Sequence, residues 1–414
     1  MNDLAALLDA IRPGSRVLMA GSAGEPIAML DAWRNDPDRT RDLLVFTCAV
    51  AGLNRFDVGA WHPSSVATGL FMPPECAAAH RAGRYRWLPV AYGGVVRHFV
   101  ERREPLDIAV VQVSPPGPDG RYSLGFSAEF MPLALQQARQ VIGIVNHAMP
   151  YIHDAPSVAG EQLTIKGEVD VPLTRHDPGA VDPGSGRIAR FIAEYVPNGA
   201  AVQVGIGKVP AALASALRGH RRLRIQTGMI GEGFRLLTEA GALDDDWRHQ
   251  GCTMVGSQSF YDWAADRRDF SIAGCEVTHD AATLARVDRF VAVNSAIEVD
   301  LLGQCNLEYV AGTPVSGPGG APDFARAAKY SAGGLSIVAL AATASRGSIS
   351  RISARLSPPG VASLARTDID MVVTEHGVAD LRGADVDERA ARLIAIAAPP
   401  FRDDLARTHH ATPR

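Results

Sequence analysis

The stretch VQVGIGKVPAALASAL, residues 202–217, combines a short apolar strand, a glycine turn and a helix. The strand is predicted over Ala201–Val204, which contains two valines, and Gly205-Ile206-Gly207 follows it directly. Glycines let the backbone turn sharply and approach a ligand, and Pro210 suits the first turn of the alanine-rich helix that comes next. The helix N-terminus favours an anion such as a phosphate, although a tight turn without a ligand fits the same residues. A strand that leads through such a turn into a helix is typical of an α/β protein.

The same alternation of apolar runs and helical stretches extends in both directions from this segment. Nine further runs, bounded by Gly, Pro, Ser or Asp, are predicted strands: Arg16–Met19, Leu43–Thr47, Ile108–Val113, Val141–Asn146, Arg224–Thr227, Thr253–Val255, Arg289–Val293, Ser336–Ala339 and Met371–Thr374. Short continuous apolar runs suggest strands that are buried on both faces, as in parallel sheets covered by helices. We therefore predict an α/β fold with mostly parallel sheets.

The two halves of the chain open in the same way. Each has a helix, then Pro-Gly (13–14) or Pro-Asn-Gly (197–199), then a strand that ends in a glycine-rich turn, AGSAGEP (20–26) or VGIGKVP (204–210). A duplicated architecture explains this pattern, and chance similarity of two βα units is the alternative. The stretch HDPGAVDPGSGR (176–187) is rich in turn-forming residues and is the best candidate for a linker. We expect two similar open α/β domains, residues 1–185 and 186–414.

Charge and cysteine content narrow the function classes. The 414 residues carry 41 Lys and Arg against 45 Asp and Glu, a formal net charge of −4, whereas a non-specific nucleic-acid binder is expected to be basic. The five cysteines show no C-x-x-C spacing, which fits reduced cytoplasmic thiols and argues against a zinc site. We see no signal peptide and no run of about 18 apolar residues, so we expect a cytoplasmic protein without a membrane span. Lysine occurs only at 166, 208 and 329, and the dominance of arginine is typical of GC-rich bacterial genomes.

Two more stretches of the second half are candidate binding loops. SGPGGAPDFARAAKYSAGG (316–334) has three glycines within four residues, and such loops present backbone N–H groups to oxyanions. A wide turn capped by Asp323 is the alternative. IQTGMIGEGFRLLTEAGAL (225–243) predicts a strand, a glycine turn and a helix with Glu232 at its entrance, where a carboxylate complements the helix N-terminus or serves in catalysis. In VSPPGPDGRYSLGFSAEF (113–130), Ser127 and Glu129 are interpreted as turn and cap residues, and the alternative is that they line a cleft.

In their order along the chain, these motifs resemble the acetyl-CoA hydrolase/transferase family, which includes the class I CoA-transferases. The resemblance covers nearly the whole chain and is carried by AGSAGEP (20–26), VSPPGPDG (113–120), VQVGIGKVP (202–210), GMIGEG (228–233), GSQSFYDW (256–263), VNSAIEVDLLGQ (293–304), VSGPGGAPDF (315–324), VVTEHGVADLRG (372–383) and RAARLIAIAAPPFR (389–402). It implies the CoA-transferase fold of two similar α/β domains, an active site between them, and acyl-CoA thioesters as substrates.

The resemblance also locates a departure from the family pattern. In the family's CoA-transferases a glutamate attacks the thioester and becomes a glutamyl-CoA intermediate. The matching position here is Gly228, which has no side chain. Three explanations follow. In the first, Glu232 takes over as nucleophile, which its four-residue spacing allows only in a helix that the nearby glycines disfavour. In the second, which we favour, the acyl group passes directly to a bound acceptor or to water. In the third, the chain has lost catalysis and acts as an acyl-CoA binder or as a partner of an active paralogue.

The resemblance implies roles for the remaining motifs if transfer is direct. Backbone groups that bind the CoA thioester are expected in the glycine loops at Val204, Gly205, Gly207, Gly317, Gly319 and Gly320. Asp323 is expected to order the second loop. The candidate bases are Glu232, Glu25, Glu276 with His279, and Glu375 with His376, the last of which replaces a tyrosine usual in the family.

The predicted function is therefore acyl-CoA-dependent transfer without a glutamyl-CoA intermediate. The alternatives are an acyl-CoA hydrolase, a carboxylate CoA-transferase that uses Glu232, and a non-catalytic acyl-CoA binder. Coenzyme A is the expected cofactor, as part of the acyl-CoA substrate, and no metal is expected. The expected partners are acyl-CoA and an acceptor, with no nucleic acid and no membrane, and the resemblance implies that the chain self-associates.

Overall fold

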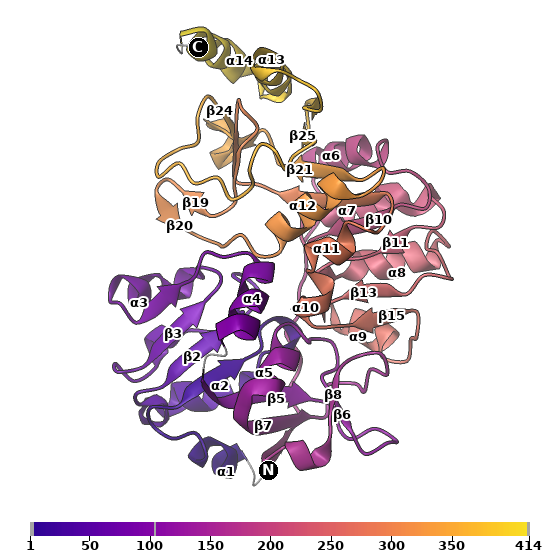
Figure 1. The fold of residues 1–414 in the computed structure, drawn as a ribbon. Coiled ribbons are helices and arrows are strands. Elements are labelled where there is room, and N and C mark those ends of the chain that lie inside the picture. The colour runs from indigo at the N-terminus through magenta and orange to yellow at the C-terminus, as the bar shows by residue number, and fades with distance from the viewer. Residues whose placement is uncertain (1–3, 103–104, 412–414) are drawn as a thin grey trace. The chain divides into compact units, whose positions relative to one another are not determined.

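A computed structural model describes residues 4–102 and 105–411 of the chain, which divides into two compact units (Figure 1). Unit 1 comprises Met1–His176 together with two later segments, His249–Thr278 and Val315–Gly319. Unit 2 comprises Asp177–Arg248, His279–Pro314 and Gly320–Arg414. Each unit has its own central sheet.

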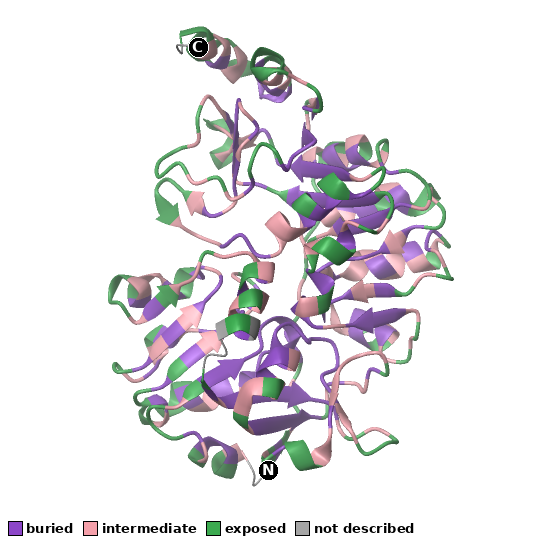
Figure 2. Cartoon of the chain, in the orientation of Figure 1, coloured by how far each residue is buried: buried purple, intermediate pink, exposed green. Residues whose placement is uncertain are grey.

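Unit 1 is built on a seven-stranded sheet in which every strand runs parallel to its neighbours. The strands, in their order across the sheet, are β4 (Tyr85–Trp87), β3 (Val66–Gly69), β2 (Leu44–Thr47), β1 (Arg16–Met19), β5 (Leu106–Val113), β7 (Ala138–Asn146) and β9 (Ile165–Val169). β5 and β7 are apolar and buried along most of their length, as expected for strands covered on both faces (Figure 2).

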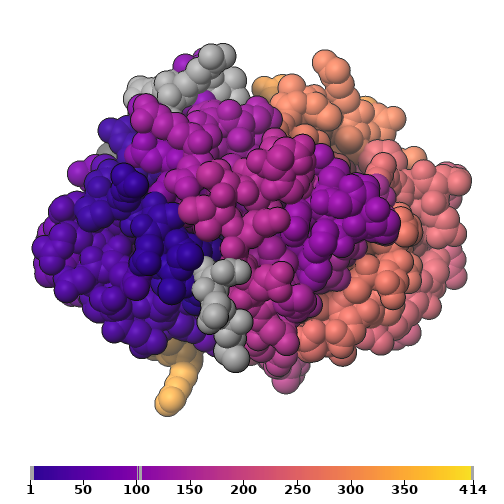
Figure 3. Space-filling view, turned by 90° about the horizontal axis from the view of Figure 1, so that it is seen from below, coloured from indigo at the N-terminus to yellow at the C-terminus, as the bar shows by residue number. Residues whose placement is uncertain are grey.

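Helices and smaller ribbons complete unit 1. The helices are α1 (Leu4–Asp9), α2 (Ile27–Asn35), α3 (Ala77–Arg81), α4 (Tyr92–Arg102), α5 (Met131–Gln137), α9 (Gln258–Ala264) and α10 (Cys275–Thr278). The paired short strands are β6 (Tyr122–Ser123) with β8 (Ser157–Val158), and β13 (His249–Gly251) with β15 (Phe270–Ile272). The core includes Trp33 and Trp61, whose rings meet edge to face with centroids 5.1 Å apart. In the space-filling view the residues coloured indigo to magenta form one continuous surface (Figure 3).

Unit 2 contains a six-stranded sheet that is parallel except for its last strand. The strands, in their order across the sheet, are β11 (Arg224–Ile225), β10 (Ala201–Val204), β16 (Phe290–Ser295), β21 (Leu335–Ala339), β25 (Met371–Thr374) and β26 (Gly377–Asp380). β26 pairs antiparallel with β25 through a hairpin. All five residues of β21 and all four of β25 are buried, because helices cover both faces of the sheet.

Unit 2 has further helices and short strands besides this sheet. The helices are α6 (Pro183–Ala193), α7 (Lys208–Ala216), α8 (Glu232–Glu239), α11 (Ala281–Leu284), α12 (Ala321–Tyr330), α13 (Val386–Ile396) and α14 (Arg402–Ala411). The short strands are β12 (Met229–Ile230), β17 (Glu298–Asp300), β18 (Cys305–Asn306), β19 (Tyr309–Val310), β20 (Thr313–Pro314), β22 (Thr343–Ala344), β23 (Ile349–Ser350) and β24 (Ile352–Ser353). β14 (Thr253–Met254) belongs to unit 1. Within the described ranges, no helix combines the length and the apolar character that crossing a membrane requires.

Both sheets share one strand order around their first strand. β1 lies between β2 and β5, and β10 lies between β11 and β16. In unit 1 the chain adds β2, β3 and β4 on one side of β1 and then continues with β5 on the other side. In unit 2 it adds β11 on one side of β10 and then continues with β16 on the other side. Such a switch point opens a crevice at the carboxyl ends of the strands, where open α/β sheets bind ligands. The repeated order confirms the predicted α/β fold with two similar, mostly parallel sheets.

The predicted linker is wrong at its C-terminal end. α6 begins at Pro183, inside the stretch 176–187 that we expected to be irregular. Asp182 caps this helix, since its carboxylate accepts the Ser185 N–H at 2.9 Å, and proline suits a first helical turn. The capping residue and the proline therefore outweigh the helix-breaking tendency of the neighbouring glycines.

Two segments that the division at residue 185 assigned to the C-terminal domain pack with unit 1 instead. The Tyr261 hydroxyl donates a hydrogen bond of 2.6 Å to the Thr174 carbonyl, and the Tyr261 ring stacks on Phe126 with centroids 5.0 Å apart. The Met254 N–H donates to the Phe126 carbonyl at 2.8 Å. Local sequence patterns do not reveal such long-range contacts, which is why we predicted a single domain boundary at residue 185.

A buried ion pair in unit 2 gives a first test of the packing. Lys329 of α12 donates to the carboxylate of Asp370, which is 4% exposed and also accepts the Ser336 N–H at 3.0 Å. Replacing Lys329 with methionine should lower the free energy of unfolding by about 2 kcal/mol, because the carboxylate loses its counter-charge. This expected loss of stability is smaller than the loss for a fully buried ion pair, since about a third of the lysine side chain is exposed.

Urea denaturation measures this change. The matched control is Arg407→Met, which removes the partner of Asp404 in an exposed pair and should change stability by less than about 0.5 kcal/mol. Equal effects of the two variants would contradict the assigned burial of Asp370.

Candidate functional site

The carboxyl end of β10 opens into the glycine turn that the sequence singled out. Gly207 has a φ of +114°, which favours glycine, and it is the N-cap of the nine-residue helix α7. A Cβ atom added at Gly205 or at Gly207 would find no heavy atom within 4 Å. The backbone of this turn is therefore open on the side-chain side, at the sheet edge beside the switch point between β10 and β16.

The segment that carries Gly228 is tied to the same strand. The Thr227 hydroxyl donates to the Val204 carbonyl at 2.7 Å, and the Gln226 N–H donates to the Val202 carbonyl at 3.1 Å. Val204 thus contributes a carbonyl that fixes Thr227. These bonds place Gly228 beside the end of β10.

Two glycine backbones meet the ring of His279. A Cβ atom at residue 228 would lie 3.0 Å from Nε2 and 3.3 Å from Cε1 of His279. A Cβ atom at residue 320 would lie 2.4 Å from Cδ2 and 2.5 Å from Nε2 of the same ring. Phe324 packs against the ring with centroids 4.7 Å apart. The structure therefore brings together two predicted site residues, Gly228 and Gly320, around a histidine that the sequence only paired with Glu276.

The surroundings of His279 keep its imidazole neutral. The residue is 2% exposed, and burial lowers its pKa to about 3. The next residue, Asp280, caps α11 through its carboxylate, which accepts the Ala282 N–H at 3.3 Å and the Thr283 hydroxyl at 2.5 Å. This cap fixes the backbone from which the ring projects. A neutral imidazole offers one hydrogen-bond donor and one acceptor.

Two buried amides on neighbouring strands have polar atoms without hydrogen-bond partners among the described residues. They are Oε1 of Gln203 on β10 and Nδ2 of Asn294 on β16, in residues 4% and 8% exposed. Because Gln203 pairs with Ala292, Gln203 and Asn294 project from the same face of the sheet. Buried polar atoms are almost always satisfied, so an unsatisfied pair beside a switch point indicates a place for a ligand or water. Neither residue was predicted as part of the site, although a polar residue inside an apolar strand was a usable signal.

The other predicted residues of unit 2 lie at separate places. Glu232 is the first residue of α8, and Asp323 lies in the first turn of α12, where each complements a helix N-terminus. His376 is exposed in the turn between β25 and β26, with Nε2 3.9 Å from the carboxylate of Glu375. That carboxylate accepts the Ala342 N–H at 2.8 Å. Three strand steps of about 4.8 Å separate β25 from β10, so His376 lies roughly 14 Å along the sheet from the turn at Gly205.

The predicted site residues of unit 1 are held by hydrogen bonds and packing contacts within that unit. Glu25 is 1% exposed, and both of its carboxylate oxygens accept the Arg55 N–H, at 2.9 and 3.0 Å. Burial raises the pKa of Glu25, while the bonds from backbone N–H groups oppose that shift. Within unit 1 the Glu25 carboxylate is therefore engaged by backbone, and its role as a base stays a prediction. Gly317 lies against the backbone of Leu70, and the Gly319 carbonyl accepts the Tyr92 N–H at 3.1 Å.

Among the described carboxyl groups of unit 1, Glu129 has the most strongly raised pKa, which its interpretation as a cap residue did not anticipate. It is 2% exposed, its carboxylate accepts the Gly21 N–H at 2.8 Å, and its φ is +43°. The backbone is held in that conformation because its N–H donates to Cys252 and its carbonyl accepts from Cys275. Burial raises the pKa of Glu129 to about 7, and the charge of Glu25 adds to the shift. No local sequence pattern predicts that a carboxyl group is buried and has a raised pKa.

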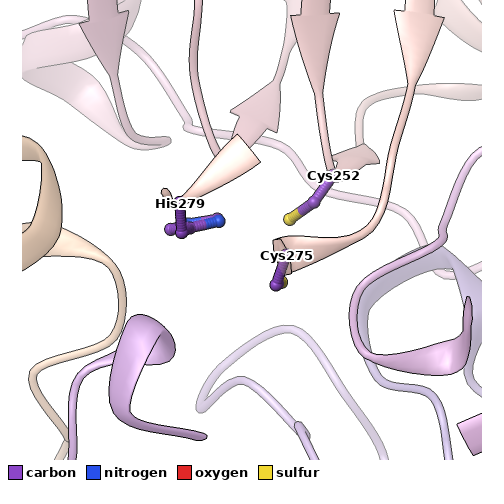
Figure 4. A group of neighbouring side chains, drawn as sticks. All are labelled: Cys252, Cys275 and His279. Carbon is purple, nitrogen blue, oxygen red and sulfur yellow. The ribbon is translucent and has the colours of Figure 1, made fainter. Parts of the chain in front are cut away.

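All five cysteines are free and buried. Figure 4 shows Cys252 and Cys275 of unit 1 with their side chains close together, and it also labels His279, which belongs to unit 2. Burial raises the pKa of the Cys275 thiol, and Cys252 adds to the shift, so the thiol is protonated and a poor nucleophile. Glu276, on the short helix α10 of unit 1, has a pKa raised by burial.

Comparisons with known proteins agree with one another. Residues 3–165 match the acetyl-CoA hydrolase/transferase N-terminal domain, and residues 256–409 match the C-terminal domain of the same family. The 4-hydroxybutyrate coenzyme A transferase of Clostridium kluyveri is 30% identical over 397 residues, which cover 94% of this chain and 92% of the relative. The acetyl-CoA hydrolase of Kluyveromyces lactis is 31% identical over 253 residues, which cover 55% of this chain and 47% of that protein.

Solved structures show the same likeness. RipA from Yersinia pestis superimposes with a TM-score of 0.88 at 27% identity, covering 98% of this chain and 95% of RipA. The 4-hydroxybutyrate CoA-transferase from Porphyromonas gingivalis superimposes with a TM-score of 0.81 at 29% identity, covering 98% and 96% of the two chains. The predicted CoA-transferase fold is therefore confirmed.

Proposed function

The chain belongs to the acetyl-CoA hydrolase/transferase family, and on that premise we propose that it passes the acyl group of an acyl-CoA directly to a small acceptor, without a glutamyl-CoA intermediate. The observation that carries the proposal is Gly228, which we align with the nucleophilic glutamate of the family's CoA-transferases. Residue 228 has no side chain, and Nε2 of His279 lies 3.0 Å from the point where one would begin. Position 228 therefore lacks a nucleophilic side chain, and the imidazole of His279 lies next to the space that such a side chain would fill.

The open turn at Gly205 and Gly207 is our candidate for the thioester. Its backbone N–H groups and the N-terminus of α7 favour the negative charge that develops on the thioester oxygen during attack. Nδ2 of Asn294 is a further donor without a partner among the described residues, at the end of the neighbouring strand. Donors of this kind are each worth about 10²–10³ in rate, so the turn supports catalysis without a covalent step. The loop with Gly317, Gly319 and Gly320 remains a second candidate for CoA binding. We propose that Asp323 holds this loop in an ordered conformation.

The functional test is release of free CoA thiol from a panel of acyl-CoAs. Each is incubated alone, with simple carboxylates, and with amines or alcohols. We expect release that depends on an amine or an alcohol, with the acylated acceptor found by mass spectrometry. Release without an acceptor identifies a hydrolase, and exchange with carboxylates identifies an ordinary CoA-transferase; either result contradicts direct transfer. Binding of CoA without turnover across the panel identifies a binder.

Glu232→Gln separates direct transfer from a displaced nucleophile. We expect this variant to keep most of the wild-type turnover, since Glu232 is interpreted as a residue that complements the start of α8. If Glu232 were the nucleophile, its loss would lower turnover by about 10³-fold or more. Borohydride or hydroxylamine trapping should likewise leave no modified glutamate, and a CoA adduct on Glu232 in peptide mass spectra would refute the proposal.

A further inference from the structure

His279 occupies the place from which a side chain at residue 228 would project. Its Nε2 lies 3.0 Å from the Cβ position of residue 228 and 2.5 Å from that of residue 320. Contacts under 3.0 Å are not tolerated by a real Cβ atom, so residue 320 must be glycine for the ring to stay where it is. Gly228 and Gly320 lie in different loops, and the absence of a side chain at both positions leaves space for the edge of the His279 ring that carries Nε2.

The ring is held in this position by unit 2 itself. Phe324 of α12 lies against it at 4.7 Å between centroids, and Phe324 in turn meets Phe290 of β16 at 6.3 Å. The Asp280 cap begins α11 directly after the histidine. A side chain fixed by an aromatic neighbour and by a helix cap has the preorganised geometry that proton transfer requires.

Building on the proposed direct transfer, we propose that His279 is the catalytic residue that moves the proton in that reaction. The acceptor hydroxyl or amine attacks the thioester carbonyl carbon, and its proton passes to Nε2 of His279 as the new C–O or C–N bond forms. The carbonyl π electrons move to the oxygen. When the carbonyl re-forms, the C–S bond breaks, and the sulfur of CoA takes the proton from Nε2. The products are the acylated acceptor and CoA thiol, and the histidine returns to its neutral form.

Alternative bases have weaker geometric support within their own units. The imidazole of His279 is neutral at neutral pH, and the burial that lowers its pKa to about 3 also makes it a weak base. Proton transfer to Nε2 must therefore accompany formation of the new bond and cannot precede it. His376 lies three strand steps from β10, and Glu232 begins α8. Both carboxylate oxygens of Glu25 are engaged by the Arg55 N–H. His279 is the group that lies next to Gly228 itself.

The test uses the acceptor that supports turnover by the wild-type protein. His279→Gln and His279→Ala should each lower kcat by about 10²–10⁴-fold, the usual contribution of general acid–base catalysis, with little change in the KM for acyl-CoA. Added imidazole should restore part of the activity of His279→Ala. His249→Gln, which replaces another histidine with 2% exposure, is the matched control and should keep its activity.

A second comparison asks whether the ring and a glutamate compete for one place. Gly228→Glu alone should gain no exchange between carboxylates, because the ring lies in the path of the new side chain. The double variant Gly228→Glu with His279→Ala should gain that exchange and should carry CoA on residue 228 in peptide mass spectra. Equal exchange in the two variants, or none in either, would count against the inference.

The outcomes separate the inference from the proposed function. Acyl transfer by the wild-type protein with full activity in both folded His279 variants would leave the function standing and overturn the role of His279. A loss of activity that follows the loss of thermal stability, without imidazole rescue, would also overturn it, since a packing role predicts that result. Absence of transfer in the wild-type protein refutes the proposed function and the inference with it.

Discussion

Replacing Gly317 with alanine should lower the free energy of unfolding by about 3 kcal/mol. A Cβ atom at this position would lie 2.0 Å from the Leu70 carbonyl oxygen and 3.1 Å from its carbonyl carbon. Both atoms belong to backbone that follows β3, so neither can move aside as a flexible side chain does. Overpacking of this kind costs about 1–3 kcal/mol, and a backbone obstacle places Gly317 at the upper end. Urea denaturation followed by circular dichroism measures the change.

The control for this variant is a glycine in open space. Gly186 lies inside α6, and no heavy atom would come within 4 Å of its Cβ atom. Gly186→Ala should therefore raise the free energy of unfolding by about 0.5–1 kcal/mol, the usual gain from alanine in a helix. If Gly317→Ala costs less than about 1 kcal/mol, the segment 315–319 is not seated on Leu70.

The stability of the protein should fall between pH 4.5 and pH 7 because of Glu129. Burial raises the pKa of this carboxyl group from its ordinary value of 4.5 to about 7. In that window the folded protein keeps a proton that the unfolded chain has released, so folding weakens as pH rises and levels off above pH 7. A shift of this size corresponds to about 3 kcal/mol. Glu129→Gln, which keeps an acceptor for the Gly21 N–H, should remove this part of the pH dependence.

The comparison is the difference in unfolding free energy between wild type and Glu129→Gln at pH 4.5 and at pH 8. We expect the difference to change by about 3 kcal/mol in favour of the variant. The exposed substitution Glu161→Gln provides the control and should show no such trend. A constant difference across this range would mean that Glu129 ionises in the folded protein as easily as in the unfolded chain.

The sequence predicted the two sheets well because their strands are apolar and bounded by turn residues. β1, β10 and β25 have the predicted limits, and β5 and β21 begin one or two residues early. β3 (VATG) and β9 (IKGEV) were missed, since both carry polar or glycine residues. Their strand character comes from pairing with neighbours along the sheet, which is a property of the tertiary structure.

The site was harder to predict, because its parts are far apart in the sequence. The glycine turns were identified from local pattern, and the missing side chain at Gly228 came from the family resemblance. The meeting of Gly228 and Gly320 at His279 depends on how three separate loops fold. Gln203, Asn294 and Glu129 owe their character to burial, which a single sequence does not display. Our assignments of Glu232, Glu25 and His376 as bases remain predictions.

The interleaving of the two units has a consequence for the order of synthesis. When His176 leaves the ribosome, the first sheet of unit 1 has been made, but Tyr261, on which Phe126 stacks, has not. About 100 residues, mostly of unit 2, must follow before segment 249–278 is complete, which takes roughly 5–20 s at ordinary translation rates. During that time Phe126 lacks Tyr261, on which its ring stacks in the folded protein. The nascent chain therefore carries an unfinished apolar surface while its second half is still being made, and a chaperone has a defined interval in which to act.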